Sequence, residues 1–289
     1  GDATDDQTIT IPRFHEGLVV DTILDSGFMD AYELITLNIP ETIKTISSRA
    51  FMNSTSLENF IIPSSVESIG SIAFRNCHSI SHFEVSSGND YFESVDGILF
   101  SKDHTVLIKY PQGKEGNSYV VPNHVLVIGE DAFSGTRNLH NVNLGLGVTT
   151  IKTHAFYQAS YIVEIIIPDQ VTTVESYAFR ECNSLEHVTI GQGLNTISSY
   201  MFNNCVQLEE IIIPQNISSI GYGAFYDCRD LRSVYILNGN TVIQGALFMF
   251  TGTSSLLHIY LPNQGIADIY KTESFWSSYA SKISVGSPE

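Results

Sequence analysis

The sequence predicts a β-rich solenoid, in which a short unit of chain is repeated and each copy stacks on the one before it. Two observations predict this fold class. A phenylalanine recurs with a period of about 23 residues along most of the 289-residue chain. Around it, fixed positions hold apolar or small residues, and one segment of each repeat alternates apolar and polar residues as a half-buried strand does. Repeats of this length bury a core only by stacking on one another, which is the organisation of a solenoid.

The phenylalanines define the number of repeats. They are Phe28, Phe51, Phe74, Phe133, Phe156, Phe179, Phe202, Phe225 and Phe250. Their spacing is constant except at two points. The step from Phe74 to Phe133 is more than twice as long as a regular repeat, and the step from Phe225 to Phe250 is slightly longer than the others. We therefore expect about nine repeats, one insertion and a slightly longer last repeat.

Each repeat is expected to contribute one main strand. Nine and eleven residues after the phenylalanine stand apolar pairs such as Ile165 with Ile167 or Ile211 with Ile213, usually followed by Pro or Gly. Because the pair alternates with polar neighbours, it indicates a strand with one buried face. Equivalent strands of successive repeats must lie side by side, about 4.8 Å apart. The sequence thus predicts a right-handed, β-rich α/β solenoid with a concave parallel sheet.

Three segments depart from the repeat. Residues 88–119 are predicted to be an insertion, with apolar runs flanking 101–104 as in a β-hairpin. Residues 1–17 are predicted to be an N-terminal cap, and residues 263–289 a C-terminal cap with one or two amphipathic helical turns. Caps are expected because terminal coils would otherwise expose core and strand edges. With the repeats over 18–262, these segments are predicted to form a single domain covering 1–289.

Charge limits the partners. Acids outnumber bases 31 to 14, which gives a net charge of -17. Such a surface repels nucleic acid and anionic membranes, and it favours cationic proteins or glycans. No apolar run reaches about 18 residues, so we expect no transmembrane segment. Residues 1–6 are polar, which is typical of a mature N-terminus that follows a removed export signal. A lipid anchor upstream of residue 1 is compatible with this expectation. A monomer is expected.

The repeat resembles a known family. Its pattern is Leu-x-x-Ile-x-Ile-Pro-x-x-Val-x-x-Ile-x-x-x-Ala-Phe-x-x-Cys, written in full from Leu57 to Cys77 with Phe60 at the first Ile position. This is similar to the BspA-like, or Treponema-type, leucine-rich repeats, and the similarity extends over residues 18–262. The resemblance implies a leucine-rich-repeat solenoid in an exported or surface-attached bacterial protein. For some members it also implies adhesion and protein binding, and it brings no shared catalytic motif.

Four cysteines suggest a disulfide or a metal at first. They are Cys77, Cys182, Cys205 and Cys228. The last three lie one repeat apart, close enough for a bridge on distance alone. All four, however, occupy the small position three residues after the phenylalanine, which Ala31, Ser54 or Ala159 fills elsewhere. We therefore expect buried free thiols in preference to disulfides or a zinc site.

The candidate binding site lies at the outward positions of the concave sheet. Its residues are Ile166, His187, Glu210, Ile212, Tyr235, His258 and Tyr260. Repeat proteins bind partners on such faces, and aromatic anchors suit a protein interface. The alternative is that β-branched and aromatic residues simply favour strands. Glu164, His187 and Glu210 on adjacent rungs could bind a divalent metal, but a solvated ladder of charges is more common. No metal or cofactor is expected.

The functional hypothesis follows from this surface. Nucleophile-elbow, phosphate-loop and zinc-protease motifs are absent from the sequence, so no catalytic residue is assigned and no enzyme is expected. We expect a non-enzymatic protein-binding or adhesion scaffold, exported to the bacterial cell surface and attached to the outer membrane. It would contact a host or bacterial surface protein through the concave face or the 88–119 hairpin. The alternative is a carbohydrate-binding accessory protein of a surface glycan-uptake system, with Tyr235 and Tyr260 as the sugar platform.

Overall fold

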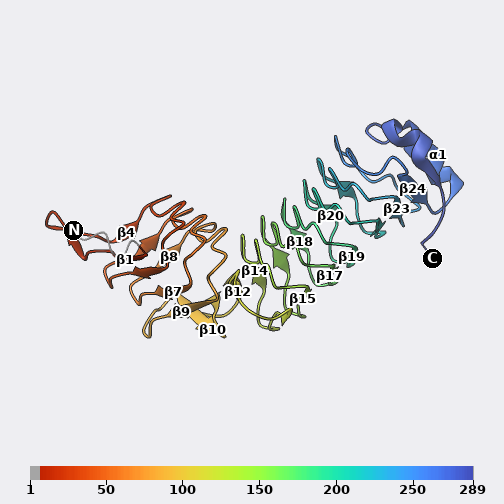
Figure 1. Ribbon diagram of the computed structural model, residues 1–289. Helices are drawn as coiled ribbons and strands as arrows, with labels where there is room; N and C mark the ends of the chain where they lie inside the picture. Colours follow the sequence, from red (N-terminus) through yellow and green to blue (C-terminus); the bar gives the residue numbers. More distant parts are fainter. Residues whose placement is uncertain (1–6, 289) are drawn as a thin grey trace. The chain divides into compact units, whose positions relative to one another are not determined.

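The computed structural model describes residues 7–288, so the polar start expected at residues 1–6 lies outside the described part. The chain divides into two compact units. Unit 1 comprises Gly1–Gly116 and Val127–Asn138, and unit 2 comprises Asn117–Leu126 and Leu139–Glu289. Each unit is built from stacked turns of chain, as the ribbon shows (Figure 1). No helix between residues 7 and 288 has the length and apolar character needed to cross a bilayer.

Unit 1 carries two rows of strands. The long strands are β1 (Thr8–Thr10), β5 (Thr36–Asn38), β7 (Asn59–Ile62) and β9 (His82–Val85). The short strands are β4 (Thr22–Ile23), β6 (Thr45–Ile46), β8 (Ser68–Ile69) and β14 (Val127–Ile128). The longer strand β12 (Val106–Lys109) belongs to the same row because it pairs with β14. Hairpin β2 (Phe14–His15) and β3 (Leu18–Val19) lies near the start of the described chain, and β10 (Phe92–Val95) and β11 (Ile98–Ser101) follow β9.

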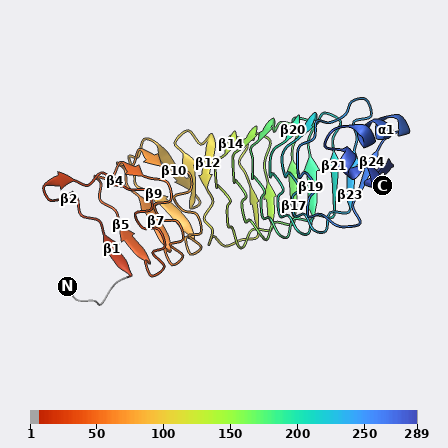
Figure 2. The ribbon, with the colours of Figure 1, turned by 90° about the horizontal axis from the view of Figure 1, so that it is seen from above.

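Unit 2 repeats the arrangement. Its long strands are β13 (Ser118–Val120), β15 (Asn141–Asn143), β17 (Glu164–Ile167), β19 (His187–Ile190), β21 (Glu210–Ile213), β23 (Ser233–Ile236), β24 (His258–Leu261) and β25 (Ile283–Val285). Its short strands are β16 (Thr150–Ile151), β18 (Thr173–Val174), β20 (Thr196–Ile197) and β22 (Ser219–Ile220). In Figure 2 the long strands β17, β19 and β21 run along one side of the unit and β20 along the other. We call these the long-strand and short-strand faces.

The strands pair in parallel with the register that the period predicts. Glu164 lies opposite His187 in the β17–β19 pair, and Glu210 opposite Ser233 in the β21–β23 pair, so each residue faces its equivalent in the next repeat. On the short-strand face of unit 1, Thr22, Thr45 and Ser68 follow the same rule. The predicted parallel solenoid is therefore confirmed, with one long and one short strand in a regular turn.

Stacked phenylalanine rings form the centre of each unit. In unit 2 the rings of Phe179, Phe202 and Phe225 lie 5.6 and 5.5 Å apart and are nearly parallel. Phe28, Phe51 and Phe74 make the same stack in unit 1, with centroids 5.5 Å apart. Each ring is thus held between its counterparts in the turns above and below, which adds about 0.5–1.5 kcal/mol per pair to the burial of the ring.

The backbone around each ring is strained in a regular way. Two residues before and two residues after most of these phenylalanines the chain adopts the left-handed conformation, whereas Phe74 has the bend on its C-terminal side alone. In unit 1, Arg49 and Asn53 have φ of 57° and 65° around Phe51, and in unit 2 Tyr200 and Asn204 have 56° and 60° around Phe202. Non-glycine residues adopt this conformation at a cost, and Asn and Asp tolerate it best. The paired bends turn the chain so that the ring enters the core.

The insertion contains the predicted hairpin. Strands β11 and β12 are antiparallel and flank the turn at 101–104, as expected, and β10 pairs antiparallel with β11. Beyond this turn, however, β12 pairs in parallel with β14, and the ring of Tyr110 stacks on Phe133 at 5.4 Å. Tyr110 precedes Phe133 by one regular repeat, so it is a tenth ring position of the repeat. Residues from Val106 onwards thus follow the solenoid pattern within the predicted 88–119 insertion.

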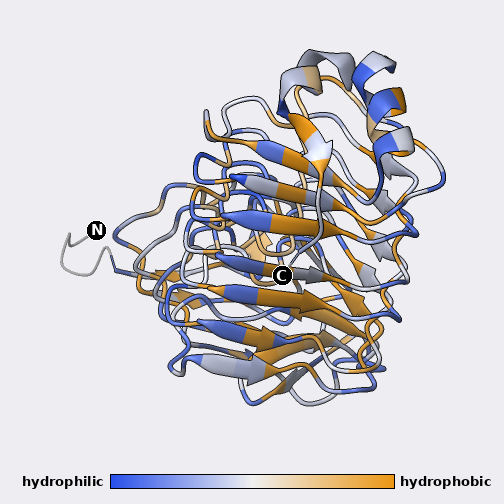
Figure 3. Cartoon of the chain, turned by 90° about the vertical axis from the view of Figure 1, so that its right-hand side faces the viewer, coloured by the Kyte–Doolittle hydropathy of each residue, from blue (hydrophilic) through white to orange (hydrophobic). Residues whose placement is uncertain are grey.

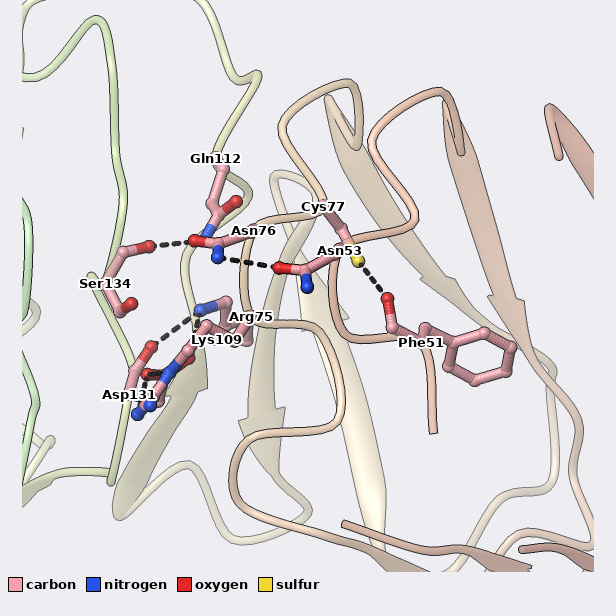
Figure 4. Close-up of polar contacts among 9 residues, drawn as sticks. All are labelled: Phe51, Asn53, Arg75, Asn76, Cys77, Lys109, Gln112, Asp131 and Ser134. Carbon is pink, nitrogen blue, oxygen red and sulfur yellow. Dashed lines mark hydrogen bonds and ion pairs between the residues drawn. The ribbon is translucent and has the colours of Figure 1, made fainter. Parts of the chain in front are cut away.

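A buried ion cluster lies where the inserted hairpin rejoins the stack (Figure 4). Lys109 Nζ donates to the carboxylate and the carbonyl oxygen of Asp131 at 3.0 and 2.6 Å, and Arg75 pairs with the same carboxylate at 2.7 Å. The side chains of Lys109 and Asp131 are 5% and 1% exposed. Removing one partner from such a cluster leaves uncompensated buried charge.

The C-terminal segment folds as the predicted cap. Helix α1 (Gln264–Thr272) begins at Asn263, whose side chain accepts the Ile266 N–H, and is followed by the 3-10 helix η1 (Ser277–Lys282). The Trp276 indole donates to the Ile243 carbonyl oxygen at 2.8 Å, and the Tyr270 hydroxyl accepts from the Ile243 N–H at 2.8 Å. The helical turns are therefore fixed to the repeat that contains Ile243.

The four cysteines are free and buried, as the sequence predicts. Each thiol points to a carbonyl oxygen of the preceding turn; that of Cys205 lies 3.2 Å from the Phe179 oxygen. In unit 1, Ser54 makes the equivalent bond to Phe28 at 2.7 Å, so the position requires a small side chain and is not specific for sulfur. Burial raises the pKa of Cys77 and Cys228 to about 12, and the pKa of Cys205 is raised for the same reason.

We expect Asp131→Asn to lower the free energy of unfolding by about 3–5 kcal/mol, because Lys109 and Arg75 would remain buried without their counter-charge. Asp25→Asn is the matched control, since Asp25 pairs with exposed Arg49 at 3.0 Å. That substitution should have a far smaller effect. Urea unfolding followed by circular dichroism measures both, and equal losses would contradict a special role for the buried cluster.

We expect the stability of the protein to fall with pH partly through His78. Burial, and then the charge of Arg137, lower the pKa of His78 to about 4. The unfolded chain, in which the histidine titrates near pH 6.5, binds more protons between these values, so stability decreases as pH falls from about 6.5 towards 4. His78→Gln should lose less stability than the wild type between pH 7 and pH 5 in urea titrations. A parallel loss in both proteins would refute this assignment.

We expect the folded protein to resist thiol reagents, because only thiolates react and the pKa values of these thiols are raised. A chromogenic disulfide reagent at pH 8 should modify few thiols in the native state and all four after unfolding in urea. Rapid modification without denaturant would show that the cysteine positions open readily.

Candidate functional site

The outward side chains of the unit 2 long-strand face form two columns. Along each strand the residues alternate, so Ile165 and Ile167 are buried while Glu164 and Ile166 point to solvent. The first outward column holds Asn141, Glu164, His187, Glu210, Ser233 and His258. The second outward column holds Asn143, Ile166, Thr189, Ile212, Tyr235 and Tyr260. Figure 3 shows the long strands stacked, with hydrophilic colour where many of them begin and hydrophobic colour further along.

The second outward column carries the predicted apolar stripe. Ile212 lies opposite Tyr235, and Tyr235 opposite Tyr260, so these three residues of the stripe adjoin. Ile166 is 53% exposed, whereas the other three are half-buried. The rings of Tyr235 and Tyr260 stack at 4.8 Å, and the main chain of Gly286 lies against Tyr260, where an added Cβ would be 2.5 Å from the ring. The tyrosines therefore offer mainly their edges to a partner.

The first outward column borders an acidic hollow. The hollow has a volume of about 790 Å³, and its lining comprises Glu186, His187, Gln207, Glu209, Glu210, Asp230, Arg232 and Ser233. Two predicted site residues, His187 and Glu210, lie in it. We call this the acidic hollow. His258 follows Ser233 in the first outward column but does not line the acidic hollow.

The charges of the acidic hollow are unbalanced. Arg232 forms an ion pair with Glu209. His187 lies 3.9 Å from Glu186, with side chains 71% and 49% exposed, so this contact is weak. Within residues 7–288, Glu210 and Asp230 have no lysine or arginine partner. The hollow therefore presents net negative charge at the side of an apolar stripe.

The metal hypothesis receives no support from this geometry. Glu164 and His187 are in register, as predicted. Within residues 7–288, however, no three histidine, cysteine, aspartate or glutamate side chains converge closely enough to hold an ion. The carboxylates of this column can attract cationic groups.

In unit 1 the inserted hairpin lies beside β9, at the edge of the long strands. The Phe83 N–H donates to the Gly97 carbonyl oxygen at 2.9 Å, and Ser94 Oγ donates to the Phe83 carbonyl oxygen at 2.6 Å. A Cβ at Gly97 would lie 2.6 Å from the side chain of His82, so the turn of the hairpin rests directly on β9. The hairpin therefore adjoins the edge of β9 that is not paired with β7, and the contact predicted for it from the sequence stays a prediction.

Sequence reasoning missed the charged loop residues that complete the hollow. Glu186, Glu209 and Arg232 each stand seven residues after the ring, in the loop just before the long strand. Their alignment is visible in the repeat, but their charges face the strand residues only once the loop is folded. The predicted site comprised strand positions alone, and so it included only part of the hollow.

Solved structures with the same fold come from bacteria. The chain is 25% identical to a leucine-rich cell surface protein of Faecalibacterium prausnitzii, over 98% of this chain and 64% of that one, with a TM-score of 0.62. It is 25% identical to the pneumococcal vaccine antigen PcpA, over 96% of this chain and 66% of that one, with a TM-score of 0.64. It thus spans slightly less than two thirds of each. A leucine-rich repeat protein of Eubacterium ventriosum, 19% identical over 86% of this chain and 83% of its own, shares the fold with a TM-score of 0.66.

No curated protein matches the chain. The sequence model of the BspA type leucine-rich repeat region matches six copies, which together cover residues 9–105, 112–231 and 149–282. These matches span most of the repeats described above and include the turns that form both outward columns. The chain therefore belongs to the family of BspA-type leucine-rich-repeat proteins.

Proposed function

We propose that this chain is a non-enzymatic adhesion scaffold at the bacterial cell surface and that it binds a basic segment of another protein in the acidic hollow. The single observation that carries the proposal is the unbalanced charge of the hollow next to an apolar stripe. Glu210 and Asp230 supply carboxylates without a cationic partner among the described residues, and Ile212 lies on the same strand as Glu210.

Electrostatics favour a cationic partner. The net charge of -17 attracts a basic protein from a distance, and the hollow would then select the part of it that carries lysine or arginine. The apolar stripe gives such a segment a surface on which to bury its own apolar side chains. A central apolar contact with charged surroundings is the usual anatomy of a protein interface.

The cell-surface part of the proposal is supported by the relatives. The similar protein of Faecalibacterium prausnitzii is described as a cell surface protein, and the pneumococcal one as a vaccine antigen. Leucine-rich-repeat proteins bind other proteins on their repeated faces, and we extend this role to the present chain. Attachment to the outer membrane belongs to the same proposal.

Sugar binding by Tyr235 and Tyr260 is the less favoured alternative on this face. A sugar ring stacks on an open aromatic face, but these two rings cover each other at 4.8 Å with an interplanar angle of 15°. The main chain of Gly286 lies beside Tyr260 as well. The long-strand face is thus better suited to protein than to glycan.

The test compares binding of purified host and bacterial surface proteins, immobilised as a panel, to wild type and to the triple variant Glu186→Gln, Glu210→Gln, Asp230→Asn. Partners captured by the wild type should bind the variant at least about tenfold more weakly, or about 1.4 kcal/mol. Binding should also weaken as salt rises.

The matched control is Glu16→Gln, Asp21→Asn, Glu58→Gln, which makes the same change in net charge at exposed positions of unit 1. It should retain most of the affinity. If the two triple variants lose equal affinity, general charge attracts the partner and the acidic hollow is not the site. Failure of every panel protein to bind the wild type would reject the proposed function.

A further inference from the structure

A second groove runs along unit 2 on the turns that follow the short strands, away from the acidic hollow. Its volume is about 680 Å³. One wall is a row of aromatic rings at or next to the left-handed position that precedes the buried phenylalanine. These rings belong to Tyr177, Tyr200, Tyr222 and Phe248, and we call them the aromatic row. Their centroids are separated by 5.0, 5.3 and 5.2 Å.

Most of the other lining residues are polar. The left-handed position that follows the buried phenylalanine places Glu181, Asn204 and Asp227 along the groove, one on each turn. The lining also includes Asn203, which is buried and donates to the Tyr226 carbonyl oxygen at 2.9 Å. Aromatic and hydrogen-bonding groups thus line the same groove on several consecutive turns.

The fold does not require aromatic residues in this row. At the same left-handed position in unit 1 stand Ser26 and Arg49, with φ of 61° and 57°. Tyr177, Tyr200 and Phe248 have φ of 62°, 56° and 60°, a conformation that is uncommon for bulky residues. Since Ser or Arg serves the same backbone, the rings are present for another reason, and strained residues of this kind gather at functional sites.

The rings become accessible towards the C-terminal end of the row. Tyr177 and Tyr200 are parallel within 8° and cover each other. Tyr222 is turned by 56° from Tyr200, and Phe248 by 77° from Tyr222, so these planes no longer stack. Tyr222 and Phe248 are 38% and 45% exposed. The row therefore offers open ring surface at one end and hydroxyl groups at the other.

The charges of the groove cancel. Arg180 pairs with Glu181 at 2.9 Å, and its guanidinium lies 5.7 Å from the rings of both Tyr157 and Tyr177. Arg229 and Asp227 contribute one further charge of each sign to the lining. In a protein with a net charge of -17 this neutrality is a local exception, so the groove suits an uncharged ligand that has both hydroxyl groups and apolar C–H surface.

We propose that this groove binds a neutral, extended oligosaccharide along the aromatic row. The C–H faces of its sugars would lie on Tyr222 and Phe248, and its hydroxyl groups would bond to Asn204 and Asp227. One sugar unit of an extended β-linked chain has about the length that separates adjacent turns, so consecutive units meet equivalent positions. This inference is independent of the proposed protein partner, which uses the other face.

The test uses β-1,4-linked glucan, mannan and xylan oligosaccharides, with an α-1,4-linked glucan oligosaccharide for comparison, in isothermal titration calorimetry. At least one β-linked probe should bind the wild type. The double variant Tyr222→Ser, Phe248→Ser should weaken that binding at least tenfold, and Asp227→Ala should weaken it as well. Melting curves establish that the variants fold.

Two single variants, one in the groove and one outside it, complete the test. Tyr200→Ser introduces the residue that unit 1 tolerates at this position, and it should reduce binding without unfolding the chain. Tyr161→Ser removes an exposed tyrosine outside the groove and should leave binding unchanged. If no neutral oligosaccharide binds the wild type, or if the groove variants bind as well as Tyr161→Ser, the proposal is overturned. Binding of a proline-rich peptide in place of the sugars, lost in Tyr222→Ser, Phe248→Ser, would also overturn it and assign the groove to protein.

Discussion

The structure depends on one requirement: every turn must place an aromatic ring in the core directly over the ring of the turn before. In most turns the backbone bends into the left-handed conformation on both sides of the ring, as at Arg49 and Asn53 around Phe51. These bends are unfavourable for most side chains, and the stacking and burial of the ring offset them. The register of the strands follows, because rings that stack at about 5.5 Å bring equivalent strand residues opposite one another.

The same requirement explains the junction at the insertion. After β9 the chain leaves the stack for β10 and β11, and it has to re-enter with a ring at the right height. Tyr110 supplies that ring by stacking on Phe133. Lys109 takes the place of the small residue that usually precedes the ring, and its charge is matched by Asp131, which occupies the left-handed position of the next turn. The ion cluster is thus a local solution to joining an irregular segment to a regular one.

Much of the fold could be predicted from the sequence, because the core positions repeat with nearly fixed residue types. The period determined the strand register, and the small position explained the cysteines. Tyr110 is hard to predict as a ring position, because a tyrosine replaces the usual phenylalanine and Lys109 replaces the small residue before it. The site was harder to predict. His187 and Glu210 were identified as outward residues, but Glu209 and Asp230 lie in loops, and only the folded turn brings them to the same hollow.

The aromatic row can be found in the sequence by aligning the repeats. Tyr177 and Tyr200 stand at a fixed distance from the core phenylalanine, so aligning the repeats displays them. Their position alone does not mark them as functional, because it belongs neither to the core nor to the strands. The backbone conformation makes them informative. A left-handed position that accepts Ser26 or Arg49 equally well imposes no ring, so the three rings that occupy it in unit 2, those of Tyr177, Tyr200 and Phe248, need a separate cause.

The two candidate surfaces differ in the kind of order they show. Positions that recur on each turn give rows with a constant spacing, which suits a ligand that is itself a regular chain. The aromatic row has this order, with neighbouring rings 5.0–5.3 Å apart. In the acidic hollow the positions recur but the charges do not, because Gln207 and Asp230 share one position of the repeat and Glu209 and Arg232 share another. An irregular arrangement of charge can be complementary only to an irregular surface, and among biological polymers that is most readily supplied by a folded protein.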